Sequence, residues 1–411
     1  MTKLTLSQPL FEELCSTRFV RESSRRIYDK ALAGGTHFKV DLDKLPACAA
    51  FVKDLILKNY PDLNVPFHSR WEHFNVGGVA RVERLEQSLP RLGGREKGAA
   101  LVDLVVVSVL VDAGAGPKWA YRARDGGTYS RSEGLAVASL EMFEAGLFSS
   151  DPDAPYRVDS KALKSLSLEK MRTAFQVDAT NPMTGLEGRV GLMQRLGHCL
   201  ERRAEYFTRS EISRPGHLID WYKSRLDADG LLPAQTLLRG LLWGLGEMWP
   251  ERIIVNECRL GDAWIYPRGA APSFDNLVAF HKLSQWLSYS MIHPLEVAGL
   301  GVSGVTEFTG LPEYRNGGLF SDMQVLVPRD VADTERTHAP DGDFLIEWRA
   351  LTVSLLDETA RRIRQDLGLS EEQLPLGKVL QGGTWLAGRE TAARLRGGQP
   401  PYKIDSDGTV F

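Results

Sequence analysis

The stretch Ser130–Gly146, SRSEGLAVASLEMFEAG, indicates most plainly which kind of fold the chain adopts. Ser130 and Glu133 have the spacing of a capping box, and Gly146 is suited to end a helix. Between these signals the apolar residues recur at helical spacing, at Leu135, Ala138 and Phe143. The stretch therefore predicts an amphipathic α-helix.

Similar patterns run along most of the chain, separated by Pro, Gly, Asn and Asp clusters. They predict helices over 10–32, 46–59, 95–112, 160–174, 186–208, 216–228, 234–248, 276–297, 342–367 and 384–396. Short strands are expected at 253–256, 324–328 and in the tail 402–411. The sequence thus predicts a mainly α fold with minor short β strands. We expect one helical domain over 1–411 and leave open two lobes, 1–150 and 151–411.

The composition is that of an ordinary globular protein with a sizeable core. Among 411 residues, 50 Lys and Arg face 53 Asp and Glu, which gives a formal net charge of −3, and 43% of the residues are hydrophobic. A nucleic-acid binder would be expected to carry a basic excess, so we expect no nucleic-acid partner.

The sequence also predicts no membrane association. The first residues lack the apolar core of a secretory signal, and the most apolar run, Leu104–Val111, is far shorter than the roughly 20 residues that cross a bilayer. The four cysteines lie far apart without a CxxC pair, which is typical of reduced thiols. We therefore expect a cytoplasmic protein.

Common cofactor motifs are absent or lack their context. GLGVSG at Gly299–Gly304 has dinucleotide-binding spacing but no preceding strand, and neither a phosphate loop nor a GxSxG elbow occurs. HSRWEHF at His68–Phe74 does not have HExxH spacing, so hydrogen bonding or substrate contact is the preferred interpretation. We expect no metal and no cofactor.

A polar line on the predicted helix 276–297 is a candidate binding surface. Lys282, Gln285 and Tyr289 share one side of this apolar helix, beside Trp286. A solvated helix face is the ordinary explanation for such a line. Gln and Tyr beside Lys favour a polar cavity instead.

Two Gly-bearing segments, 113–129 and 310–319, are predicted to be shaped loops that carry chemistry. In LPEYRNGGLF, Glu313, Tyr314 and Arg315 precede residues that allow a tight turn. A surface turn with an exposed ion pair explains this segment equally well.

In VDAGAGPKWAYR, Asp112 ends an apolar helix, where it is suited either to acid–base work or to capping backbone groups. The candidate phosphate-binding cations are Lys118, Arg131, Arg315 and Arg349.

The segments quoted above, together with EWRALTV, GGTWLAG and the terminal SDGTVF, resemble the uracil-catabolism protein family over nearly the whole chain. Members of this family occur in a pyrimidine-degrading route that ends in urea and a three-carbon acid. The resemblance implies this pathway and does not define a reaction.

The sequence also resembles, more faintly, the queuosine-salvage nucleotide glycosidases, which are all-helical relatives of helix-hairpin-helix DNA glycosylases. Their KRAQ helix matches HKLSQ here, and their DYR loop matches PEYR. This resemblance implies a helix-hairpin-helix glycosylase-like core, with Lys282, Gln285 and Glu313 in the site and Asp112 in a matching position. Glu at 313 in place of Asp departs from the pattern and implies a different leaving base.

Together these observations predict hydrolysis of an N-glycosidic bond in a small riboside or ribonucleotide derivative, of the ribosylurea type, with or without a 5′-phosphate. We expect Glu313, Asp112 and Lys282 to be catalytic. The expected substrate contacts are Gln285, Tyr314, Arg315, Lys118, Trp119, Trp286, Tyr289, His281, Arg131 and Tyr129. The open alternatives are a ureido amidohydrolase of the same route and a non-catalytic nucleotide-binding partner of another pathway enzyme.

Overall fold

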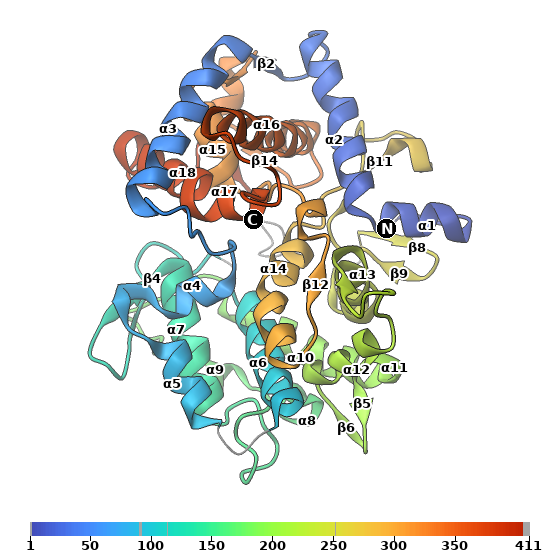
Figure 1. Cartoon of the computed structure of the whole chain (residues 1–411), viewed down its shortest axis with the longest axis vertical. Helices are drawn as coiled ribbons and strands as arrows, with labels where there is room; N and C mark the ends of the chain where they lie inside the picture. Colours follow the sequence, from blue (N-terminus) through green and yellow to red (C-terminus); the bar gives the residue numbers. More distant parts are fainter. Residues whose placement is uncertain (1, 90–92, 113, 251, 406–411) are drawn as a thin grey trace. The chain divides into compact units, whose positions relative to one another are not determined.

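The computed structural model describes residues 2–89, 93–112, 114–250 and 252–405. It confirms the mainly α fold, in which helices dominate and the strands are short and scattered (Figure 1). The helix-hairpin-helix core remains a prediction. The terminal SDGTVF segment lies outside the described residues, and only Lys403–Ile404 of the predicted tail strand is described as a strand.

The α-helices of the structure have the following bounds: α1 Gln8–Leu14, α2 Thr17–Leu32, α3 Leu45–Asn59, α4 Arg70–Phe74, α5 Arg81–Ser88, α6 Gly94–Leu110, α7 Arg131–Glu144, α8 Ser160–Lys164, α9 Leu168–Ala174, α10 Leu186–Arg202, α11 Ala204–Phe207, α12 Leu218–Lys223, α13 Ala234–Leu245, α14 Lys282–Val297, α15 Tyr314–Asp322, α16 Asp343–Leu367, α17 Leu376–Val379 and α18 Trp385–Arg396. Each predicted helix corresponds to one or two of these. The predicted helix 10–32, for example, is interrupted at Ser16, whose side chain caps α2.

The strands form small ladders. Their bounds are β1 Thr2–Leu4, β2 Phe38–Val40, β3 Ala120–Arg122, β4 Thr128–Ser130, β5 Thr208–Arg209, β6 Ile212–Ser213, β7 Leu232–Pro233, β8 Ile253–Val255, β9 Cys258–Arg259, β10 Ala263–Ile265, β11 Leu277–Ala279, β12 Val302–Ser303, β13 Leu326–Pro328, β14 Thr337–His338 and β15 Lys403–Ile404. One sheet has three strands in the order β1-β8-β9, and the other ladders are pairs. Such short ladders fix the connections between helices.

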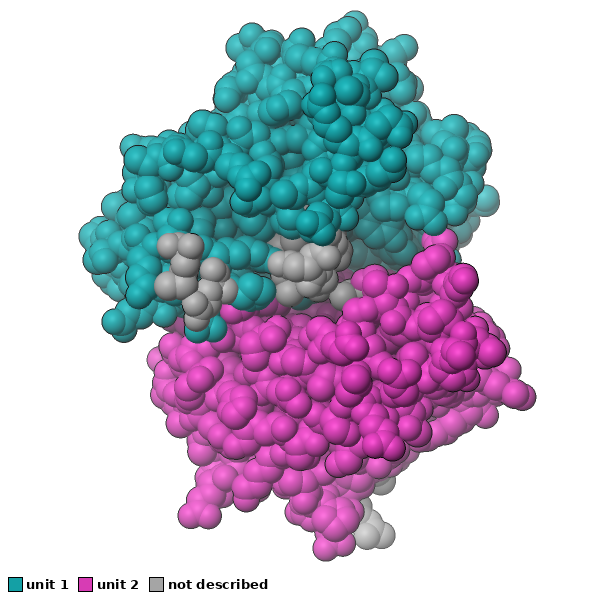
Figure 2. Space-filling model, turned by 180° about the vertical axis from the view of Figure 1, so that it is seen from behind, with its two compact units in different colours: residues 1–68, 250–285, 304–411 teal, residues 69–249, 286–303 magenta. Residues whose placement is uncertain are grey.

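The chain divides into two compact units, which Figure 2 colours separately. Unit 1 contains residues 1–68, 250–285 and 304–411, and unit 2 contains residues 69–249 and 286–303. Both units are assembled from segments distant in sequence, and residue 150 falls inside unit 2.

Unit 1 is organised around the long helix α16, against which α2, α3 and α15 pack. Much of α16 is buried, including Trp348 and Arg349 at 1% exposure. Helices α15 and α18 approach closely, because a Cβ at Gly388 would collide with the carbonyl of Arg315. A glycine is therefore required where these helices cross.

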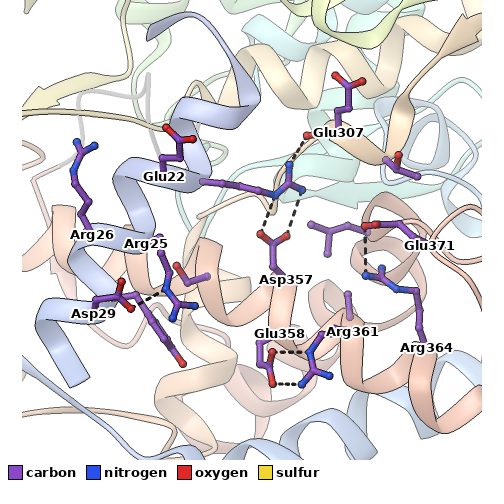
Figure 3. Close-up of a pocket in the computed structure, with 16 residues that line it drawn as sticks. Glu22, Arg25, Arg26, Asp29, Glu307, Asp357, Glu358, Arg361, Arg364 and Glu371 are labelled. Atoms are coloured by element: carbon purple, nitrogen blue, oxygen red, sulfur yellow. Dashed lines mark hydrogen bonds and ion pairs between the residues drawn. The ribbon is translucent and has the colours of Figure 1, made fainter. Parts of the chain in front are cut away.

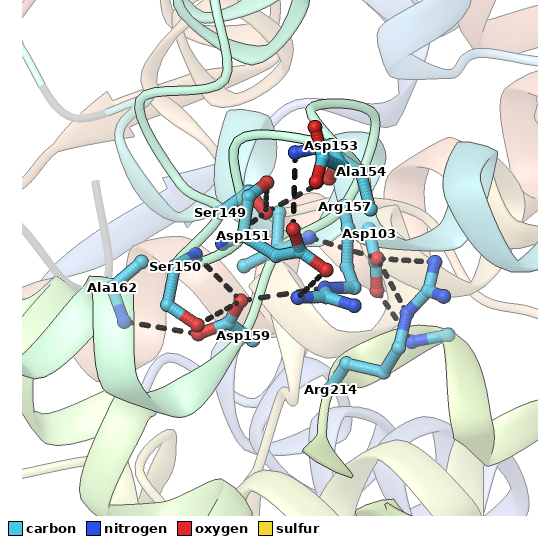
Figure 4. Close-up of polar contacts among 12 residues, drawn as sticks. Asp103, Ser149, Ser150, Asp151, Asp153, Ala154, Arg157, Asp159, Ala162 and Arg214 are labelled. Carbon is cyan, nitrogen blue, oxygen red and sulfur yellow. Dashed lines mark hydrogen bonds and ion pairs between the residues drawn. The ribbon is translucent and has the colours of Figure 1, made fainter.

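Unit 2 is organised around α6, whose residues from Gly98 to Leu110 are all buried. Buried among these apolar neighbours is the carboxylate of Asp103. It accepts hydrogen bonds from Arg214 Nε at 2.8 Å, Gly216 N at 2.7 Å and Val158 N at 2.9 Å. Figure 4 shows this cluster, in which one carboxylate ties two distant segments to α6.

Three local predictions differ from the structure. Residues 277–279 pair with β10 as strand β11, so the helix predicted from 276 begins at Lys282. Residues 314–322 form α15, where a loop was expected. Helix α7 is confirmed, with Gly146 at a φ of 73°, but the Ser130 side chain makes no cap hydrogen bond.

None of the helices in the described ranges combines the length and the apolar character that crossing a membrane requires.

The buried Asp103 cluster predicts a large stability effect. Asp103→Asn keeps the side-chain size but removes the buried one of the two carboxylates that pair with Arg214, the other being Glu96, and weakens three buried hydrogen bonds. This should lower the free energy of unfolding by about 2–4 kcal/mol. Urea denaturation followed by circular dichroism measures the change. The control Asp366→Asn removes a half-exposed partner of Lys53 and should change the free energy by less than about 1 kcal/mol. Equal losses of stability in the two variants would show that the buried hydrogen bonds of Asp103 do not stabilise unit 2.

Candidate functional site

Glu313 is a buried carboxylate held at the N-terminus of α15. One oxygen accepts a hydrogen bond from the backbone N–H of Arg315 at 2.9 Å, and the other from that of Asn316 at 2.6 Å. The residue is 8% exposed. Two backbone amide donors at the helix N-terminus hold both carboxylate oxygens in place. The structure therefore fixes the position of the Glu313 side chain.

An aspartate–arginine pair connects the Glu313 loop to the start of α14. Arg349 binds Asp262 through both terminal nitrogens, at 2.6 and 2.7 Å, and its Nε donates to Pro312 O at 3.3 Å. The same Asp262 carboxylate accepts the backbone N–H of Lys282 at 3.0 Å. Unit 1 thus ties the residue before Glu313 and the backbone of Lys282 to one buried ion pair.

Gln285 makes a second connection between the same segments. Its side chain is fully buried, donates to Thr309 Oγ1 at 2.7 Å and accepts from Thr309 N at 2.9 Å. His281 is also buried, and its Nε2 lies 3.0 Å from Leu14 O. In the structure both side chains hold backbone segments in place, and their predicted substrate contacts remain predictions.

Tyr314 and Arg315 begin α15 beside Glu313. The Arg315 guanidinium lies 5.1 Å from the Tyr314 ring centre and 4.6 Å from that of Trp385. Arg315 is 7% exposed, so its charge is largely removed from water and stacked on aromatic rings.

Unit 2 contains a separate polar cluster around Asp112. Its Oδ1 lies 3.0 Å from Arg70 Nη1, and both of its oxygens lie 2.7 Å from Ser132 Oγ. Arg70 is completely buried and also contacts Ser108 Oγ at 2.8 Å and His73 Nδ1 at 3.3 Å. Burial lowers the pKa of Arg70, whereas the charge and hydrogen bonding of Asp112 oppose this. Asp112 thus supplies the counter-charge of a buried arginine.

Two tryptophans of unit 2 that were predicted to contact the substrate, Trp286 and Trp119, are buried. Trp286 lies over Arg70, 5.6 Å from the guanidinium carbon to the ring centre. Trp119 is fully buried and donates to Phe175 O at 2.9 Å, so it belongs to the core of the unit.

The other predicted contacts in unit 2 are distributed as follows. Tyr289 is 1% exposed, Tyr129 is half-buried with Arg81 over its ring, and Lys118 and Arg131 are exposed. Of the predicted residues in unit 2, Asp112 and Trp286 contact the Arg70 cluster.

A groove of about 1080 Å³ lies in unit 1 between residues of α2 and α16 (Figure 3). Four of its arginines form ion pairs: Arg21 with Asp357, Arg25 with Asp29, Arg361 with Glu358 and Arg364 with Glu371. Since these guanidinium groups already have carboxylate partners, the groove offers little net positive charge for an anionic ligand.

Among the described residues, no three His, Cys, Asp or Glu side chains lie together in a way that suits a metal ion. Their cysteines are all free thiols, and burial raises the pKa of Cys48 and Cys199 to about 12. Neutral buried thiols are poor nucleophiles.

Arg70, Ser132 and Asp262 were not predicted as members of these clusters. Arg349 was predicted as a phosphate-binding cation, and the structure buries it with both terminal nitrogens on Asp262. In HSRWEHF the two histidines are the conspicuous residues, and Arg70 lies between them. Ser132 belongs to a stretch that is explained as a helix start. Buried polar pairs of this kind depend on contacts between distant segments, for which the local sequence carries no signal.

Comparison with known proteins identifies the family. The family described as "Protein of unknown function (DUF1688)" matches residues 13–411. The chain belongs to this family. It is 36% identical to "Uracil catabolism protein 4" of Lachancea kluyveri and 38% identical to "Protein urg3" of Schizosaccharomyces pombe (strain 972 / ATCC 24843), over 99% of this chain and the full length of each relative. The resemblance to the uracil-catabolism proteins is confirmed.

The Asp262–Arg349 pair predicts a specific pH dependence. Burial alone would raise the pKa of Asp262, but the charge and hydrogen bonds of Arg349, with those from Lys282 and Trp264, hold this pKa well below its ordinary value. The unfolded chain therefore takes up a proton near pH 4 while the folded chain does not. The stability from this group is complete above pH 4 and is lost as the pH falls through the lower folded pKa.

Asp262→Asn should accordingly reduce the slope of the free energy of unfolding against pH between roughly pH 5 and pH 2. Urea unfolding at a series of pH values measures the slope, with Asp366→Asn as the control. An unchanged slope in a folded Asp262→Asn protein would show that this carboxyl titrates normally.

Proposed function

We propose that the chain acts in uracil catabolism and hydrolyses the N-glycosidic bond of a ribosylurea-type compound, with or without a 5′-phosphate. Its relative in Lachancea kluyveri is named for uracil catabolism and matches along its full length. The sequence resembles a protein family whose members occur in a pathway that releases urea, and this supports a ureido leaving group.

The observation that carries the proposal is the fixed, buried carboxylate of Glu313. Cleavage of an N-glycosidic bond passes through an oxocarbenium-like sugar cation, which an anion stabilises best when it is held in advance and shielded from water. Glu313 satisfies both conditions. Two backbone amides donate to its oxygens and hold them in place, and only 8% of the residue is exposed to water.

In the proposed reaction the bond between C1 of ribose and the ureido nitrogen breaks, and its electron pair stays on nitrogen. The cation that develops at C1 is stabilised by Glu313, and a water molecule adds its oxygen to C1. One proton of that water ends on the leaving nitrogen. The products are ribose, or its phosphate, and urea.

Lys282 is the proposed donor toward the leaving group. Asp262 fixes the backbone N–H of Lys282 at the first turn of α14, and Arg349 connects the same carboxylate to the Glu313 loop. This shared anchor supports a joint role for the two residues in unit 1. Asp112 remains the second candidate carboxylate, predicted from the sequence.

The direct test incubates the purified chain with ribosylurea, ribosylurea 5′-phosphate, uridine and uridine monophosphate, and measures free urea and sugar. We expect release of urea and sugar in equal amounts from one of the two ribosylureas. A folded protein that releases sugar from none of the four compounds would contradict the proposed function.

Glu313→Gln should lower kcat by about 100-fold or more and leave KM nearly unchanged, because the charge acts on the developing cation. Steady-state kinetics on the best substrate measures both constants. Glu335→Gln, at a carboxylate that is 81% exposed, is the control and should be fully active. An unchanged kcat in Glu313→Gln would remove Glu313 from the mechanism.

A further inference from the structure

The Arg70 cluster of unit 2 has two hydrogen-bonding capacities that the described residues do not use. The first is Arg70 Nη2, which is buried and has no hydrogen-bond partner among the described residues. A buried donor without an acceptor is unfavourable and is rare in folded proteins. The second is at Asp112, because a carboxylate accepts about four hydrogen bonds and the neighbours Ser132 and Arg70 use only part of this capacity.

The cluster is close to electrical neutrality. Asp112 contacts Arg70 directly and also acts electrostatically on Arg189, while Glu133 acts on Arg70. Two guanidinium groups are thus balanced by two carboxylates. A charged ligand would upset this balance at a largely buried site, so the electrostatics favour a neutral ligand.

Solvent reaches the cluster at Asp112 and Ser132. The Asp112 side chain is 11% exposed and Ser132 is half-buried, whereas Arg70 is completely covered. A ligand therefore meets the acceptor Asp112 first and the donor Arg70 behind it. The ring of Trp286 over the guanidinium adds a flat apolar wall.

From this arrangement we propose that the Arg70–Asp112 cluster is a binding site for a neutral ureide, a group in which C=O and N–H lie side by side. The ureide N–H donates to Asp112, and its carbonyl oxygen accepts from Arg70 Nη2 once the Ser132 side chain, which contacts both residues, rotates away. The ligand thus presents one donor and one acceptor side by side, and the ion pair presents the matching acceptor, Asp112, and donor, Arg70. The proposal concerns binding at unit 2 and does not require hydrolysis.

Ligand-detected NMR titrations of the full wild-type chain test the chemistry, with N-methylurea, methylguanidinium and inorganic phosphate as probes. We expect N-methylurea to bind and the two ions to bind about tenfold or more weakly. Methylguanidinium has the shape of N-methylurea but lacks the carbonyl acceptor. Equal binding of either ion, or no binding of N-methylurea, would overturn the proposal.

Variants in unit 2 test the position of the site. Asp112→Asn should weaken N-methylurea binding about tenfold, and Asp153→Asn, at an exposed aspartate of the same unit, should leave it unchanged. Should Asp112→Asn fail to fold, Ser132→Met keeps both charges and covers the exposed edge, so it should block binding. Undiminished binding in a folded Asp112→Asn or Ser132→Met protein would place the ligand elsewhere. N-methylurea binding without turnover of any riboside would leave this inference intact while the proposed function fails.

Discussion

The burial of guanidinium groups is the constraint on which both units depend. An arginine removed from water is tolerated only when carboxylates and carbonyls surround it, and those acceptors must come from whichever segments pack nearby. In unit 1, Arg349 meets this need with Asp262 and the carbonyl of Pro312. In unit 2, Arg70 meets it with Asp112 and Ser132. Each arginine thereby fixes loops that hydrophobic packing alone would leave less precisely placed.

This constraint explains how loops on a helical scaffold come to hold reactive groups rigidly. The segment before α15 is held at its backbone by Arg349 and Gln285, and the carboxylate of Glu313 is held in turn by the first amides of α15. When the backbone and the carboxylate are both held in place, little free energy is needed to reorganise them as charge develops nearby. The same ion pair that stabilises the fold of unit 1 therefore also fixes the segment that carries Glu313.

The sequence predicted the fold class because apolar residues at helical spacing mark long helices such as α2 and α16, which bury one side more than the other. It misplaced the start of α14, since the apolar residues 277–279 suit a helix and a strand equally and their pairing with β10 lies outside the local pattern. It also missed α15, because Asn316 and Gly317 favour a turn; Gly317 is in fact needed where a Cβ would lie 2.7 Å from Trp348. Asp112 and Glu313 could be selected from their positions beside apolar segments and glycines. Arg70 could not, and Arg349 was selected for phosphate binding and not for its ion pair with Asp262, because the partners of both arginines are distant in the sequence.

The central claim is that the bond broken lies between the ribose carbon and the ureido nitrogen. Hydrolysis of ribosylurea that carries ¹³C at its ureido carbonyl, followed by NMR of the products, tests it most directly. Cleavage at the ribose carbon releases the label as intact urea, in equal amount with ribose. Label in bicarbonate or carbamate, with release of ribosylamine, would show that the carbonyl is attacked and would contradict the mechanism built on Glu313.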